Sequence, residues 1–182
     1  MSDQEIGKKM VEEMELEPFL DEYAAVTGRK LEVLGRSERP DFICRRGREP
    51  YLGLESVKVI EDPISRQWEE ILNGSVDVDP LDTAIHLQEA VYRKEDKRKI
   101  PGWRCPARTI LVLQLMEAPA EEVGRYLDIQ ILDEMSATGF LEIWAADYTV
   151  FEPYGTVELL GIKPRKWRGI HRHRLYGTKP YG

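Results

Sequence analysis

Residues 39–58 read RPDFICRRGREPYLGLESVK and place two carboxylates where strands are expected to be buried. Asp41 opens the apolar run Phe42-Ile43-Cys44, and Glu55 interrupts a second run that continues to Ile60. The RRGREP turn between the two runs predicts an antiparallel hairpin. An ionised group that is taken out of water needs an opposite charge, hydrogen bonds or a metal ion. The two acids therefore require partners, and the rest of the chain has to supply them.

The elements around this hairpin predict an α/β fold with one mixed sheet and helices on both faces. Helices are expected over residues 4–26 (with a break near Pro18), 65–72, 80–99, 120–126 and 129–136. Strands are expected over residues 31–34, 41–45, 51–60, 108–116, 141–148 and 156–160. We expect a single domain over residues 1–182, with a core over about 5–118 and with C-terminal strands and a basic tail over 139–182.

The composition is that of a globular protein. The chain has 182 residues, of which 42% are hydrophobic and 32% are charged. No stretch approaches the roughly 20 apolar residues needed to cross a bilayer, and the acidic N-terminus does not resemble a secretory signal. Cys44 and Cys105 stand far apart without CxxC spacing, which favours buried thiols over a disulfide or a metal site. A cytoplasmic location is the expectation.

Charge is distributed unevenly along the chain. The formal net charge is −7, yet residues 163–182 hold seven basic side chains and no acidic one. The segments 93–104 and 163–174 each interleave basic residues with a tryptophan, which is typical of contact with nucleic acid. The alternative is a solvated surface above packed tryptophans. The predicted nucleic-acid contacts are Arg165, Lys166, Arg168, Arg172 and Arg174.

The hairpin predicts that Asp41 and Glu55 lie close together. Antiparallel pairing brings side chains on one face to within about 5 Å of each other. Two carboxylates at that distance repel unless one is protonated or a cation lies between them. Mg²⁺, or Mn²⁺ in its place, suits such a pair and a substrate phosphate. The alternatives are a turn aspartate at a strand start and a glutamate paired with an arginine of residues 45–48.

The order α-β-β-β-α-β, with Pro40-Asp41 on the second strand and Glu55 on the third, resembles the PD-(D/E)xK nuclease superfamily, the fold of many restriction endonucleases. The resemblance covers about residues 5–118. It implies that Asp41, Glu55 and the backbone carbonyl of Ser56 bind Mg²⁺, and that a lysine two residues beyond the acidic position assists the attacking water. The implied activity is endonucleolytic hydrolysis of DNA phosphodiesters. Members that cut both strands often pair as dimers, so a homodimer is a further expectation.

The motif lysine is missing, because Val57 stands two residues after Glu55. Lys58 follows, but strand alternation points it to the opposite face. Lys94 continues an apolar stripe of the helix over 80–99 by one turn, and Lys97 lies on the same side. Some divergent members of the superfamily supply the lysine from this helix. We therefore predict Lys94 as the catalytic lysine, followed by Lys97 and then Lys58.

Two other functions stay open from the sequence. The first is a catalytically inactive module of the same fold that binds nucleic acid or a protein partner, since position 57 lacks lysine. The second is an interaction protein whose acidic first helix is the partner surface and whose carboxylates are structural. Metal-dependent cleavage distinguishes a nuclease from the inactive module. Salt-dependent binding of nucleic acid distinguishes both of these from the interaction protein.

Overall fold

The computed structural model describes residues 2–60, 71–72, 79–151 and 155–172, and within them seven strands form one sheet in sequence order. The strands are β1 (Glu32–Arg36), β2 (Phe42–Arg45), β3 (Leu52–Val59), β4 (Thr109–Leu115), β5 (Glu142–Asp147), β6 (Glu158–Lys163) and β7 (Gly169–His171). The helices are α1 (Asp3–Thr27), α3 (Pro80–Arg98), α4 (Ala120–Gly124) and α5 (Ile129–Ser136), with 3₁₀ turns η1 (Pro106–Arg108) and η2 (Arg165–Trp167).

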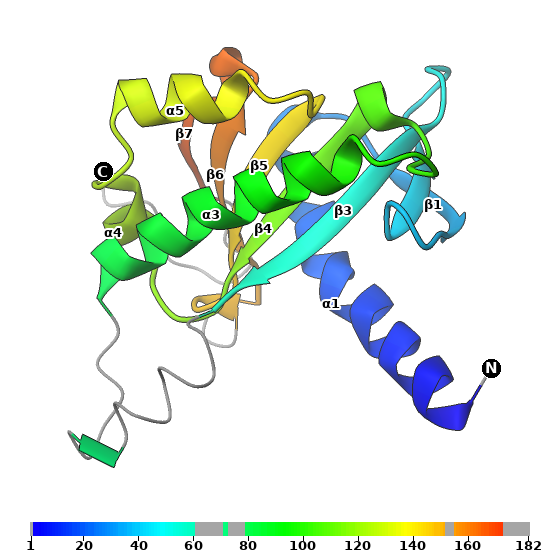
Figure 1. Ribbon diagram of the computed structural model, residues 1–182, viewed down its shortest axis with the longest axis horizontal. Helices are drawn as coiled ribbons and strands as arrows, with labels where there is room; N and C mark the ends of the chain where they lie inside the picture. The colour runs from blue at the N-terminus through cyan, green and yellow to red at the C-terminus, as the bar shows by residue number, and fades with distance from the viewer. Residues whose placement is uncertain (1, 61–70, 73–78, 152–154, 173–182) are drawn as a thin grey trace.

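The sheet is mixed. Strands β1, β2 and β3 pair antiparallel, β3, β4 and β5 pair parallel, and β5, β6 and β7 pair antiparallel. Parallel neighbours need a crossover connection, which is where α3 and the α4–α5 pair occur in the chain. Figure 1 shows α3, α4 and α5 over one face of the sheet and α1 behind the other. The predicted mixed sheet with helices on both faces is confirmed.

Two hydrophobic clusters hold these layers together. One lies between the sheet and α3, α4 and α5, and it includes Leu87, Leu113 and Phe140. The other lies between the sheet and α1, and it includes Phe19 and Trp144. Strand β4 has helices over both of its faces and is buried throughout. This double burial explains why its sequence is an almost continuous apolar run.

Helix α1 is longer and more regular than the sequence predicts. It continues through Pro18, so the expected break is wrong. A proline removes one backbone donor, and here the buried neighbours Leu16 and Phe19 hold the helix against the sheet. Ser2 and Glu5 form a capping box at its start. The first turns of α1 extend beyond the edge of the sheet and are exposed (Figure 1).

The remaining differences between expectation and structure are small. The helix predicted over 65–72 lies outside the described residues except for Ile71 and Leu72, which are helical. Strand β6 ends at Lys163 instead of residue 160, and β7 is an additional strand. None of the described helices is both long enough and apolar enough to cross a membrane.

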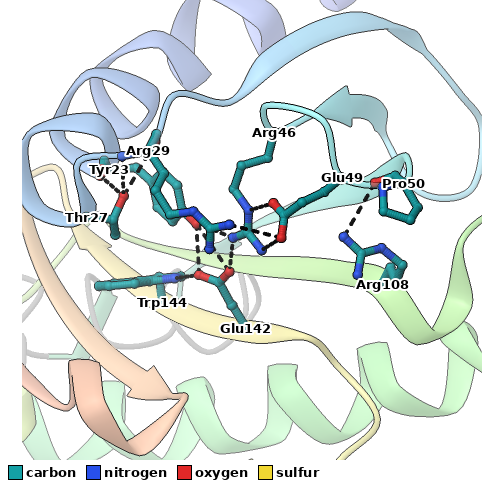
Figure 2. A network of polar contacts seen from close by, with 9 residues as sticks. All are labelled: Tyr23, Thr27, Arg29, Arg46, Glu49, Pro50, Arg108, Glu142 and Trp144. Carbon is teal, nitrogen blue, oxygen red and sulfur yellow. Dashed lines mark hydrogen bonds and ion pairs between the residues drawn. The ribbon is translucent and has the colours of Figure 1, made fainter.

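A buried network of charges ties the hairpin turn to α1 and β5 (Figure 2). Arg46, between β2 and β3, pairs with Glu49 at 2.6 Å and with Glu142 at the start of β5. Glu142 also accepts hydrogen bonds from the Tyr23 hydroxyl at 3.1 Å and the Trp144 indole at 2.9 Å. Opposite charges and donors meet throughout this network, so it holds the turn in place.

Candidate functional site

The candidate site lies where β2 separates from β3. Strand β2 pairs with β3 only at Leu52, Gly53 and Leu54. From Glu55 onward, β3 continues its pairing with β4 but not with β2. The outer edge of β3 is therefore open to side chains at the very point where its apolar run is interrupted. Asp41, the residue before β2, lies beside the part of β3 that does not pair with β2.

Pro40 and Gly53 bring Asp41 to that edge. A β-carbon built on Gly53 would lie 2.4 Å from Cγ of Pro40 and 3.0 Å from the hydroxyl of Thr109. The missing side chain at position 53 thus lets the proline ring pack directly on β3. Pro40 of the Pro-Asp sequence contacts Gly53 of the Gly-Leu-Glu sequence. This contact sets the position of Asp41 relative to Glu55.

Asp41 and Glu55 are joined through the backbone. The amide of Asp41 donates to Oε2 of Glu55 at 3.0 Å, and the amide of Ser56 donates to Oδ2 of Asp41 at 3.0 Å. The N–H and C=O groups of a strand residue point to the same edge, so the carbonyl of Ser56 also faces Asp41. The structure brings the two predicted carboxylates together, and strand geometry turns the Ser56 carbonyl toward the same edge.

The proximity of two carboxylates changes the protonation of Asp41. Burial, followed by the charge of Glu55, raises the pKa of Asp41 from 3.8 to about 6. The Ser56 amide and the Lys94 ammonium lower this pKa, but not enough to restore it. Glu12 of α1 raises it further. The carboxylates of Asp41 and Glu55 therefore carry more negative charge than the ammonium group of Lys94 neutralises.

Lys94 is the lysine that reaches the site. Its Nζ lies 2.9 Å from Oε1 of Glu55, and both side chains are largely buried. Lys97 is exposed and does not line the site, and Lys58 pairs with Glu15 of α1 at 3.1 Å. The alternative in which an arginine of residues 45–48 neutralises Glu55 is wrong, because Glu55 pairs with Lys94 and Arg46 is engaged by Glu142.

A pocket of about 530 Å³ opens onto these groups. Its walls come from β3, from α3 through Lys94, and from the N-terminal half of α1 through Lys8 and Glu12. Gln114 of β4 also lines it. The sequence suggests Glu22 as the contribution of the first helix, and this residue does not line the pocket. Lys8, Glu12 and Gln114 are not predicted, although an isolated glutamine inside the apolar run of β4 is a signal that could have been used.

The predicted nucleic-acid contacts lie elsewhere. Arg165 and Lys166 are exposed in η2, beyond β6. Arg168 pairs with Asp133 of α5 at 2.8 Å, and Arg172 pairs with Glu121 of α4 at 2.7 Å and with Glu158. Arg174 lies outside the described residues. The basic segment is thus partly engaged by acidic side chains of its own chain.

The donor set fits a hard divalent cation. No group of three or more His, Cys, Asp and Glu side chains in the described part of the chain is arranged around a metal position. A site with two carboxylates and one carbonyl does not require such a group, because Mg²⁺ keeps several waters and takes substrate oxygens as further ligands. Two carboxylates that share one ammonium group, that of Lys94, favour a further cation there.

Comparison of this chain with protein-family models, with curated proteins and with solved structures finds no match in any of the three. Function has to be argued from the site, because a fold alone hosts many activities.

Proposed function

We propose that this protein is a Mg²⁺-dependent nuclease of the PD-(D/E)xK superfamily that hydrolyses phosphodiesters in DNA. The observation that carries the proposal is the convergence of Asp41, Glu55 and Lys94 at the free edge of β3. The order α1-β1-β2-β3-α3-β4 agrees with the αβββαβ core of that superfamily. Lys94, from α3, stands in for the lysine that Val57 replaces.

Each group has a distinct role in this proposal. The carboxylates of Asp41 and Glu55 and the carbonyl of Ser56 would hold the cation. When bound, Mg²⁺ supplies Lewis acidity and lowers the pKa of coordinated water. Lys94 orients the attacking water and offsets the negative charge that develops on the phosphate. Its contact with Glu55 keeps the ammonium group beside the reacting centre.

The test is a cleavage assay on labelled DNA with Mg²⁺ or Mn²⁺. We expect Asp41→Ala to abolish cleavage, because one of two carboxylate ligands is lost. Lys94→Ala should lower the rate by about 10²–10⁴-fold, the usual contribution of a positioned proton-transfer or orienting group. Lys97→Ala is the matched control, one turn further along the same helix and exposed, and it should leave the rate unchanged.

Two results would contradict the nuclease assignment. One is metal-dependent cleavage that survives Asp41→Ala, since the activity would then come from another site or a contaminant. The other is equal loss of activity in the Lys94 and Lys97 variants, since the site would then not distinguish the buried lysine from the exposed one. Circular dichroism and thermal unfolding of each variant exclude loss of the fold as the cause.

A second candidate is a binding module of the same fold without catalysis. Val57 packs against the hydrophobic cluster under α3, so a partly buried apolar side chain occupies the usual lysine position. Lys94 is bonded to Glu55, where it can serve charge compensation alone. Binding of Mg²⁺ and DNA without any product would identify this candidate in the same assay.

A further inference from the structure

The pocket that holds the candidate site is small and is walled by helices from both faces of the sheet. Its volume is about 530 Å³, and residues of α1 and of α3 line it together with the edge of β3. Glu55 is only 5% exposed at its base. A phosphodiester must therefore enter the pocket to reach the two carboxylates.

The wall formed by α1 is a poor surface for a duplex. Glu12 lines the pocket from this helix, and Glu15 lines it as the partner of Lys58. Asp3 and Glu5 are exposed in the first turn. A duplex carries one negative charge per roughly 1.7 Å of its axis, so several phosphates would lie against these carboxylates at once. A strand end brings only one or two phosphates.

Cations and apolar groups for such an end are present in the pocket. Lys8 of α1 and Lys58 of β3 line it together with Lys94. Val11 and Val57 provide apolar walls for a sugar or a base. Among the described residues that line the pocket, these three lysines are the cations, which is a short contact set for phosphates near the scissile bond.

The exposed basic residues of η2 do not line the pocket. Arg165 and Lys166 follow β6, which lies three strands from β3, or roughly 14 Å at about 4.8 Å per strand. Lys163 at the end of β6 pairs with Ile143 near the start of β5. Ile143 in turn pairs with Leu111, which pairs with Glu55, so Lys163 is level with Glu55 but three strands away from it and outside the pocket lining.

From these observations we infer that the site acts on single-stranded nucleic acid, at or near a strand end, and not on an intact duplex. The inference rests on the proposed function and names its substrate class. Lys8 contacts a phosphate next to the scissile one, and the acidic wall of α1 excludes a second strand. Lys8 is a specificity-determining residue in this arrangement.

The test compares a labelled single strand of about 12 nucleotides with the blunt duplex of the same sequence. Binding is followed by fluorescence anisotropy and cleavage by product formation in Mg²⁺. We expect the single strand to bind at least about tenfold more tightly than the duplex, which is about 1.4 kcal/mol. Lys8→Ala should weaken binding of the single strand several-fold. Lys30→Ala, an exposed lysine before β1, is the matched control and should not.

Reversing the charge of one side chain in the α1 wall tests directly whether this wall excludes a duplex. Glu12→Lys should strengthen duplex binding more than single-strand binding, because the repulsion is larger for the more highly charged ligand. Equal or tighter binding of the duplex to the wild type would overturn the inference, and so would a Lys8→Ala variant that binds the single strand normally. Absence of any binding would overturn it as well.

The two proposals fail in different ways. If cleavage depends on Mg²⁺ and on Asp41 but the duplex is preferred, the substrate class is wrong and the nuclease assignment stands. If the single strand binds with the expected preference and no product forms, hydrolysis is wrong and the preference for single strands stands.

Discussion

Two buried glutamates of this protein, Glu142 and Glu55, differ in how fully nearby donors and cations balance their negative charge. Glu142 is 6% exposed and Glu55 is 5% exposed. Glu142 receives the Arg46 guanidinium, the Tyr23 hydroxyl and the Trp144 indole, and Figure 2 shows these donors converging on its carboxylate. Glu55 receives one ammonium and one backbone amide, and a second carboxylate lies beside it.

The difference lies in charge balance and in access. In the network around Glu142, burial raises the pKa of the Tyr23 phenol, which therefore remains a neutral donor, and Arg46 lowers the pKa of its second partner, Glu49. The groups around Glu55 carry two negative charges against one positive charge and open into a pocket. Removing one partner from a fully paired buried charge is costly, whereas a site with an excess of one charge can bind a ligand of the opposite charge.

The largest effect on stability is expected at Glu142. Glu142→Ala leaves the buried Arg46 without one of its two carboxylates, which should lower the free energy of unfolding by about 3 kcal/mol. Glu55→Gln should lower it by less, about 1 kcal/mol, because the substitution keeps the shape, relieves repulsion from Asp41 and leaves the Asp41 carboxylate to offset the charge of Lys94. Urea denaturation of both variants without metal makes the comparison. Equal losses of unfolding free energy would show that the two glutamates contribute equally to stability, which would contradict the comparison.

The second effect is expected at Gly53. A methyl group there would meet the ring of Pro40, so Gly53→Ala should cost about 1–3 kcal/mol. The displaced Pro40 would carry Asp41 with it, and affinity for Mg²⁺ should fall. Gly35→Ala in β1 is the matched control, because nothing lies within 4 Å of its added β-carbon. Normal metal affinity in a folded Gly53→Ala variant would contradict the role given to the Pro40 contact.

The smallest effect concerns the protonation of Asp41. Its pKa is raised to about 6 in the fold, so the charged form destabilises the metal-free protein above pH 6 and this cost disappears as the pH falls toward 4. Asp41→Asn should therefore stabilise the metal-free protein by about 1 kcal/mol at pH 7. The gain should shrink as the pH is lowered from 7 to 5. A gain that is constant with pH would mean that the charge of Asp41 is not its cause.

The sequence predicts the site better than it predicts the surroundings of the site. The hairpin turn and the spacing of apolar residues bring Asp41 and Glu55 together, and the helical stripe through Lys94 points to the lysine that the structure places there. These relations are local or follow from the period of one element. The position of α1 is not local, so Lys8 and Glu12 could not be assigned to the pocket.

The basic C-terminal segment illustrates the same limit. Arg168 and Arg172 lie in a run of positive charge, yet their partners are Asp133, Glu121 and Glu158, which come from separate elements. Pairs at such separations depend on how α4 and α5 pack on the sheet, and composition does not reveal this. Their role in binding nucleic acid stays a prediction.

The most direct measurement is calorimetric titration of the protein with Mg²⁺ and Mn²⁺ at pH 7.5, for the wild type, Asp41→Asn and Asp82→Asn. Asp82 is an exposed carboxylate in the first turn of α3 and serves as the matched control. The charge imbalance at Asp41 and Glu55 predicts one binding site per chain that is lost in Asp41→Asn and kept in Asp82→Asn. Metal binding that is absent from the wild type, or unchanged in Asp41→Asn, would contradict it.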